Sequence, residues 1–176
     1  IESHSTAQER VDGIRNLKEL HQRRWNNIGY PGFFAGGKYN NFFGSVIDKF
    51  ERKGWIWFKT ATENSTCIAG RLAFKFNNRF YDYLTGFDES TPAAKRRPGL
   101  ALLMEMIEDA IKEGFSQIDL LRGQELYKFD FTDLAVNNHN FRVKMKSHGK
   151  RSAFLGLNIM RIISFFRFMA AKEYEL

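Results

Sequence analysis

The chain has 176 residues, of which 43% are hydrophobic and 27% are charged. This balance favours a single soluble globular domain with a full hydrophobic core. The formal net charge is +7, but residues 142–176 carry six of these seven charges, so the basic composition does not argue for DNA binding.

Two helices are predicted first. Thr6 and Glu9 have the spacing of a capping box, so a helix is expected to follow them to about residue 27. Its predicted inner face carries Ile14, Leu17, His21, Trp25 and Ile28. Residues 30–32 (Tyr-Pro-Gly) break this helix, and residues 39–53 form a second candidate that Gly54 closes.

Three antiparallel strands are predicted next, at 55–62, 66–76 and 79–87, because these ranges are rich in aromatic and β-branched residues. Turn-like residues at 63–65 and 77–78 separate them. In the middle strand, large apolar side chains alternate with basic or small ones, which predicts that one face of the strand is buried and the other is exposed. The alternating sets are Leu72, Phe74 and Phe76 against Arg71, Ala73 and Lys75.

From Gly99 the pattern is helical again. The predicted apolar face of this helix carries Leu100, Leu103, Ile107, Ala110 and Ile111. Gly114 suits the position just past the helix end. A buried strand is predicted at 115–121, another strand at 139–147, and a strongly apolar helix at 154–171.

This order of elements predicts an α/β (α+β) fold, with a mixed, mostly antiparallel sheet flanked by helices, N-terminal helices and an apolar C-terminal helix. We divide the chain into a domain over 1–150 and a basic C-terminal helix over 151–176. The chain begins at Ile1 rather than Met, so a missing N-terminal half is expected. The C-terminal helix is expected to pack on the domain or on that missing half. Peripheral contact with a membrane surface is the alternative.

Cysteine and histidine content narrows the chemistry. Cys67 is the only cysteine, so no internal disulfide can form, and a buried strand position is expected for it. The histidines have no ligand-like spacing with one another or with Cys67, so no metal site is expected. Residues 1–30 lack the apolar run of a signal peptide, and no stretch reaches the length of a membrane span. We therefore expect a cytoplasmic protein.

The start of the helix near Gly99 is a candidate phosphate site. A helix N-terminus offers free N–H groups and a positive dipole end, and Gly99 would let the backbone approach an anion. Arg96 and Arg97 add charge, and Pro98 pre-sets φ for a helix start. An ordinary Pro-Gly helix start with solvated arginines is the alternative, and spacing alone favours it.

Arg96-x-x-Gly99-x-Ala101 resembles the acyl-coenzyme A signature of the GNAT acyltransferase superfamily, (Gln/Arg)-x-x-Gly-x-(Gly/Ala). Further segments resemble the branch found with bacterial cellulose and exopolysaccharide biosynthesis proteins, which is related to the Fem-type aminoacyl transferases. These segments are Leu20-His21-x-x-Arg24-Trp25 with Gly29 and Gly32-Phe33, then Gly86-Phe87-Asp88, then Asp119-Leu-Leu-Arg122-Gly123-x-Glu125-x-Tyr127-Lys128. The resemblance covers about residues 15–130, and members of this branch usually carry a preceding half of similar fold.

The resemblance implies a GNAT-like acyltransferase, in which an amine or hydroxyl attacks the thioester of acyl-coenzyme A directly and the acceptor is a saccharide or cell-envelope precursor. Implied coenzyme-binding residues are Leu84, Thr85, Arg96, Arg97, Gly99, Leu100 and Ala101, with backbone N–H groups around Tyr83 beside the thioester. Implied substrate-binding residues are His21, Arg24, Asp88 and Arg122. The alternatives are a Fem-type transfer from aminoacyl-tRNA and a catalytically degenerate binding module in polysaccharide biosynthesis.

Three residues after the buried strand are candidates for catalysis. Glu125 is the candidate base, since a carboxylate in a partly apolar cleft has a raised pKa; a surface ion pair with Lys128 or Arg122 is the alternative. Tyr127 is the candidate acid, and a buried ring with a bonded hydroxyl is its alternative. Lys128 would balance phosphate or carboxylate charge, or be merely solvated.

His21 is either a packed, hydrogen-bonded residue or a substrate contact, and Asp119 is expected to form a structural ion pair with an arginine.

Overall fold

The structure is a computed structural model that describes residues 1–4, 6–137 and 139. Residues Ile1–Asp133 form one unit, and the helices and strands described below all lie in it. The predicted helix at 154–171, the boundary at residue 150 and nearly all of the strand predicted at 139–147 lie outside the described residues. Of the described helices, none has the length and apolar character that crossing a membrane requires.

The two N-terminal helices form where the sequence predicts them. In α1 (Ala7–Asn27) the Thr6 hydroxyl accepts the Glu9 N–H, and the Glu9 carboxylate accepts the Thr6 N–H, both at 3.1 Å. This reciprocal pair is the predicted capping box, and it fixes the first turn. The second helix, α2 (Gly37–Glu51), begins two residues earlier than predicted, and Gly54 follows it with φ +68°.

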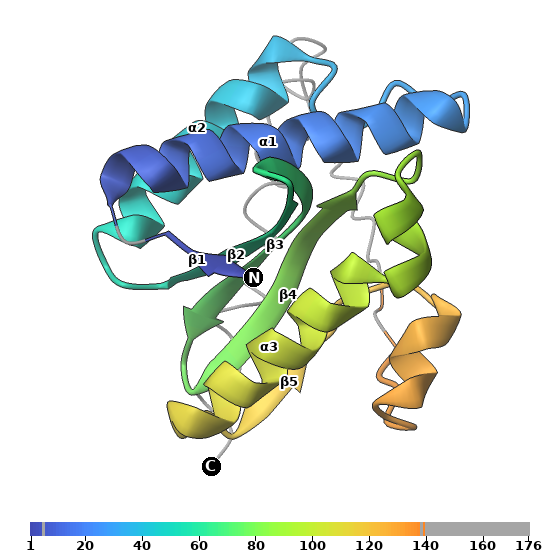
Figure 1. Cartoon of the computed structure of the whole chain (residues 1–176). Coiled ribbons are helices and arrows are strands. Elements are labelled where there is room, and N and C mark those ends of the chain that lie inside the picture. The colour runs from blue at the N-terminus through green and yellow to red at the C-terminus, as the bar shows by residue number, and fades with distance from the viewer. Residues whose placement is uncertain (5, 138, 140–176) are drawn as a thin grey trace, which may run out of the picture. The chain divides into compact units, whose positions relative to one another are not determined.

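The sheet has five strands in the order β1-β2-β3-β4-β5 (Figure 1). They are β1 (Glu2–Ser3), β2 (Ile56–Glu63), β3 (Thr66–Phe76), β4 (Arg79–Phe87) and β5 (Gln117–Asp119). All neighbours are antiparallel except β4 and β5, which are parallel, so the predicted mixed, mostly antiparallel sheet is confirmed. Positive φ angles at Asn64, Ser65, Asn77 and Asn78 make tight turns between β2, β3 and β4.

Helices cover both faces of the sheet (Figure 1). Leu17 of α1 and Phe43 of α2 pack against Leu72 on one face, whereas Leu103 of α3 (Pro98–Lys112) packs with Ala73 on the other. The prediction of a half-exposed middle strand is therefore wrong. Arg71, expected at the surface, is only 3% exposed, because α3 and the segment after β5 cover its face.

The predicted helix faces are right near the sheet and wrong at the ends. On the predicted face of α1, Leu17 is buried, but Trp25 and Ile28 are 39% and 57% exposed. On the predicted face of α3, Leu103 and Ala110 are buried, while Ile111 is 70% exposed. The buried residues that the predicted faces missed include Leu20, Leu102 and Met106. The strand predicted over 115–121 is only three residues long, because the chain turns at Leu121, where φ is +56°.

A pair of glycines lets α1 lie directly on the sheet. Gly70 of β3 and Gly86 of β4 are cross-strand partners. A Cβ atom at Gly86 would lie 2.8 Å from the backbone N of His21 and 3.1 Å from the Leu17 carbonyl oxygen. A Cβ atom at Gly70 would lie 3.2 Å from the Leu17 Cβ. Close approach of α1 to β4 therefore depends on the missing side chain at Gly86.

Gly86→Ala should destabilise the domain by about 1–3 kcal/mol, because the new methyl group meets helix backbone that cannot rotate away. Gly44→Ala is the matched control, since Gly44 lies inside α2 and a methyl group there would have no neighbour within 4 Å. It should raise stability by about 0.5–1 kcal/mol. Urea denaturation measures both changes, and equal stability of the two variants would contradict the close contact.

Candidate active site

The sheet opens between β4 and β5. The two strands pair only at Arg79–Gln117, Phe80–Ile118 and Tyr81–Asp119. At that point the Asp119 carboxylate accepts the Leu121 N–H at 2.8 Å and the chain turns away. Asp119 thus stabilises a turn rather than the predicted ion pair with an arginine. From Asp82 to Phe87, β4 has no partner strand at this edge among the described residues.

A β-bulge in β4 begins where β5 leaves. Leu72 pairs with Leu84 but Ala73 pairs with Asp82, so Tyr83 is the extra residue. A bulge bends its strand and re-aims the neighbouring groups. The Tyr83 ring stacks on Phe43 at 6.3 Å, and burial raises the pKa of its hydroxyl. The predicted N–H donors near Tyr83, Leu84 and Thr85 are therefore on the bent part of β4, which pairs with β3 but has no described partner strand at its other edge.

The predicted phosphate turn lies beside that part of β4. A short 3₁₀ helix (Pro92–Arg96) leads into Arg97, whose φ of +52° directs the chain into α3. Gly99 is buried, and a Cβ atom there would lie 3.5 Å from Thr85 Cγ2 and 3.6 Å from Phe87 Cδ1. These are ordinary contact distances, so an alanine side chain would fit at position 99 within the domain. Gly99 and the end of β4 are brought together as expected.

Few backbone donors remain free in this turn. The Arg97 N–H donates to a carbonyl of the preceding 3₁₀ turn at 3.0 Å. The N–H groups of Leu100 and Ala101 donate to the Arg97 carbonyl at 2.9 and 3.1 Å. Pro98 has no N–H, which leaves Gly99 as the first-turn donor without an intrahelical acceptor.

The two arginines of the turn differ. Arg96 forms an ion pair with Glu63 at the end of β2. Arg97 is exposed and makes no ion pair with any residue in the described part of the chain. Of the two, Arg97 is the one whose charge is available to an incoming anion.

Lys128 closes the loop that follows β5. It lies in a 3₁₀ helix (Leu126–Asp130), is 8% exposed, and donates to the carbonyls of Leu121 and Arg122 at 3.4 and 3.2 Å. Its ammonium also lies 2.9 Å from the Glu125 carboxylate. The alternative of a solvated lysine is therefore wrong, and Lys128 holds the loop together. The Arg122 side chain, in contrast, is exposed.

Glu125 is less basic than predicted. Burial alone would raise its pKa, but the hydrogen bond and charge of Lys128 outweigh burial, so the pKa of Glu125 lies below its ordinary value of 4.5. The prediction of a raised pKa is wrong, and the alternative of an ion pair with Lys128 is confirmed. A carboxylate held in this way is a weak proton acceptor.

A buried ion pair that the sequence did not reveal lies beside this loop. Arg71 and Asp82 are 2.6 Å apart, with side chains 3% and 5% exposed. Burial raises the pKa of Asp82, while the charges of Arg71 and Lys128 oppose that rise. Arg71 Nε and Asp82 Oδ1 have no hydrogen-bond partner among the described residues. An arginine and an aspartate on neighbouring strands were the available signal, but packing of α3 and of the segment after β5 makes them a buried pair.

Tyr127 lies partly buried against the α3 side of the sheet. Burial raises the pKa of its hydroxyl, and the negative charge of Asp82 raises it further. Tyr127 therefore remains protonated at neutral pH, as a proton donor must.

His21 lies where α1 crosses β4. Its Nε2 accepts the Trp25 indole N–H at 3.0 Å, and its ring meets Phe34 edge to face at 5.5 Å. Burial, aided by the charge of Arg24, lowers the pKa of His21 to about 4, so the ring is neutral at pH 7. Its Nδ1 is buried and has no partner among the described residues. His21 is therefore packed and hydrogen-bonded as one of its two predicted roles requires, but only one of its two ring nitrogens has a hydrogen-bond partner among the described residues.

Asp88 and Arg24 link the end of α1 to the end of β4. The Asp88 carboxylate accepts the hydroxyl and N–H of Ser90 at 2.6 and 2.9 Å and pairs with Arg23 at 2.9 Å. The two Ser90 hydrogen bonds are the main reason that the pKa of Asp88 is lowered. Arg24 pairs with Glu89 at 3.1 Å. Both predicted substrate residues thus already have structural partners beside the open edge.

Cys67 is partly buried in β3, and burial raises the pKa of its thiol. Within residues 1–4, 6–137 and 139, no three His, Cys, Asp or Glu side chains gather as metal ligands would.

Comparison with known proteins gives a family and a fold. Residues 2–129 match the family model described as an acetyltransferase (GNAT) domain. An aminoglycoside acetyltransferase from an uncultured soil metagenomic sample, solved with sisomicin, is 13% identical, with 80% of this chain and 93% of that chain covered and a TM-score of 0.56. The Paia N-acetyltransferase of Thermoplasma acidophilum, solved with coenzyme A, is 16% identical over 73% of this chain and 83% of that chain, at a TM-score of 0.49. No curated protein matches the chain. At 13% identity the first of these structures shows a shared fold.

Lys128→Met should lower stability by about 1–3 kcal/mol, because it leaves two loop carbonyls and a carboxylate without their donor. It should also raise the pKa of Glu125, which NMR of the carboxyl carbon follows during a pH titration. The Glu125–Lys128 pair stabilises the fold above the ordinary pKa of 4.5, and this contribution is lost as the pH falls through the lowered pKa. Lys112→Met is the control, since Lys112 pairs with Glu108 on the surface at 3.3 Å. An unchanged Glu125 pKa in Lys128→Met would show that the two groups do not interact.

Proposed function

Because the chain belongs to the GNAT family of acetyltransferases, we propose that it transfers an acyl group from acyl-coenzyme A to an amine or hydroxyl of a saccharide or cell-envelope precursor. Family membership makes the chain an acyltransferase. The identity of the acceptor rests on the resemblance of residues 20–33, 86–88 and 119–128 to the branch associated with bacterial polysaccharide biosynthesis. Fem-type transfer from aminoacyl-tRNA is the alternative.

The parting of β4 from β5 supports this proposal most directly. It exposes the bent edge of β4 at Tyr83–Thr85, and Gly99 at the start of α3 packs beside the same edge. Backbone N–H groups on this edge would polarise a thioester carbonyl. The Gly99 N–H, the positive end of α3 and the Arg97 guanidinium would hold the pyrophosphate.

Tyr127 is the proposed proton donor. When the acceptor nitrogen forms its bond to the acyl carbon, the carbon–sulfur bond breaks and a thiolate leaves. Tyr127, protonated at neutral pH, would give its proton to that sulfur. The acceptor ammonium must lose a proton before attack, and the nitrogen loses another once it is bonded to the acyl carbon. Solvent water takes up these protons, because Glu125, whose pKa is lowered by Lys128, is a weak base. We therefore assign Glu125 to attracting the cationic acceptor rather than to setting the rate.

Acetyl-coenzyme A and coenzyme A should each raise the melting temperature of the chain, because a ligand that binds only the folded state stabilises it. Arg97→Gln should weaken this binding about tenfold, as expected for one lost charged hydrogen bond to phosphate. Arg52→Gln should not, since Arg52 pairs with Asp48 in α2. No stabilisation by millimolar coenzyme A would sink the proposal, and stabilisation by aminoacyl-tRNA alone would favour the Fem-type alternative.

Tyr127→Phe should lower kcat about a hundredfold or more, which is the usual contribution of a positioned acid. Glu125→Gln should cost less than about tenfold, because the native carboxylate is a weak base. Activity of the unaltered chain should persist as pH rises and fall only above the ordinary Tyr pKa of 10, since that of Tyr127 is raised. Steady-state rates with a panel of amino sugars measure all three. A larger loss in Glu125→Gln than in Tyr127→Phe would reverse the two assignments.

A further inference from the structure

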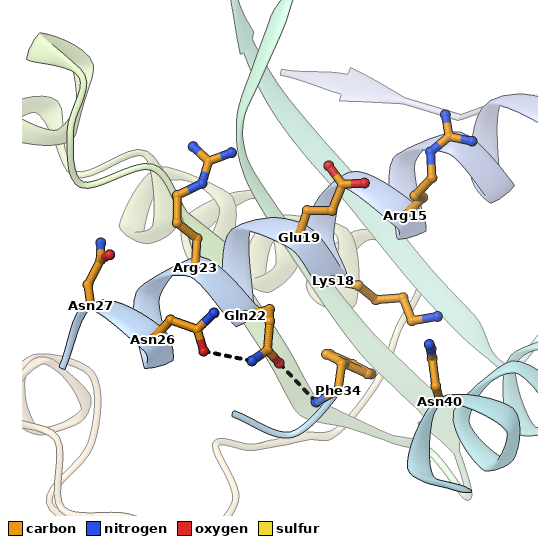
Figure 2. A pocket seen from close by; sticks show the side chains of 9 residues that line it. All are labelled: Arg15, Lys18, Glu19, Gln22, Arg23, Asn26, Asn27, Phe34 and Asn40. Atoms are coloured by element: carbon orange, nitrogen blue, oxygen red, sulfur yellow. Dashed lines mark hydrogen bonds between the residues drawn. The ribbon is translucent and has the colours of Figure 1, made fainter. Parts of the chain in front are cut away.

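A polar groove of about 640 Å³ runs along the outer side of α1 toward the start of α2 (Figure 2). Its walls carry Lys18 and the amide side chains of Gln22, Asn26, Asn27 and Asn40. A second hollow of about 650 Å³ shares Lys18 and Asn40 with it and continues along α2 past Asn41 and Ser45. The two hollows border each other at Lys18 and Asn40, and we call them together the α1–α2 groove.

Lys18 is held in place without a counter-charge. Its ammonium lies 5.4 Å from the centre of the Phe34 ring and 5.7 Å from that of Phe43, so two aromatic faces fix its position. No carboxylate in the described part of the chain pairs with it. Glu19 also lines the groove, but its side chain points away from Asn40, whereas Lys18 extends toward Asn40 (Figure 2).

The two arginines at the groove are already paired, whereas Glu19 makes no ion pair with any residue in the described part of the chain. Arg15 lies 2.7 Å from Asp12, and Arg23 lies 2.9 Å from Asp88. At the far end of the groove, Asp48 lies 2.8 Å from Arg52. Burial lowers the pKa of Lys18, which shows that its ammonium has lost part of its hydration. A partly desolvated cation without a counter-ion attracts an anionic group.

The rest of the groove suits hydroxyl groups. Asparagine amides both donate and accept, as sugar hydroxyls do. Gln22 is used internally, because it accepts the Phe34 N–H at 3.2 Å and donates to Asn26 at 2.9 Å. Asn27, Asn40 and the amide nitrogen of Asn26 remain along the wall. The first turn of α2, which carries Asn40, contains no acidic residue that would repel an anion.

A layer of rings separates this groove from the open edge of β4. Phe34 meets Phe43 at 5.1 Å, and Phe43 stacks on Tyr83 at 6.3 Å. A ligand in the groove would thus be held on the far side of these rings from the proposed thioester position. The groove is a separate binding site, and its occupancy does not depend on the acyl-coenzyme A proposal.

We infer that the α1–α2 groove binds a sugar that carries a carboxylate or phosphate, with the anionic group on Lys18 and the hydroxyl groups on the neighbouring asparagines. Isothermal titration of the whole chain with glucuronate, glucose 6-phosphate, glucose and inorganic phosphate tests this directly. At least one anionic sugar should bind about tenfold or more tightly than glucose and than phosphate alone, because both parts of the ligand make contacts.

Lys18→Met should remove this preference, since it keeps an apolar stem over the rings and deletes the charge. Lys53→Met is the matched control, because Lys53 also lies over a ring, that of Trp55 at 4.7 Å, but outside the groove. Asn40→Ala should weaken binding with Lys18 intact. Equal affinity for glucose and for both anionic sugars would overturn the inference, and so would equal losses in Lys18→Met and Lys53→Met. Phosphate binding as tightly as glucose 6-phosphate would overturn the assignment of a sugar. The preference among ligands is measured on the unaltered chain, so the test holds even if one variant does not fold.

Discussion

The backbone of α1 lies directly on the cross-strand pair Gly70 and Gly86, and the arrangement of the domain depends on that contact. It brings His21 to β4 and lets Asp88 reach Arg23. Phe34 packs beside α1 against Phe43, and Phe43 in turn stacks on Tyr83. The same helix therefore borders the open edge of β4 on one side and forms the α1–α2 groove on the other.

Charged side chains hold the loop that borders the open edge of β4 on its other side. Lys128 closes the loop after β5, and the buried pair of Arg71 and Asp82 lies beside it. A buried pair is costly to break, because the remaining ion has no water. Burial raises the pKa of Tyr127, and the charge of Asp82 raises it further against the opposing charge of Arg71.

Local signals in the sequence predicted local structure well. The capping box at Thr6 predicted the first helix, and the turns at residues 64–65 and 77–78 predicted the three-stranded meander. Short-range hydrogen bonds and φ preferences decide both features. Burial of Arg71 and the lowered pKa of Glu125 could not be predicted, since α3 and the folded-back loop create them. The resemblance located the turn at Gly99 beside β4, but it gave no sign of the α1–α2 groove.

The central claim is that acyl-coenzyme A lies against the unpaired edge of β4 with its pyrophosphate at the start of α3. Amide chemical shifts recorded during a coenzyme A titration test it most directly. We expect the largest changes at residues 83–87 and 97–101, saturating with one common dissociation constant. Changes confined to other parts of the chain, or none in these two segments at saturation, would contradict the claim.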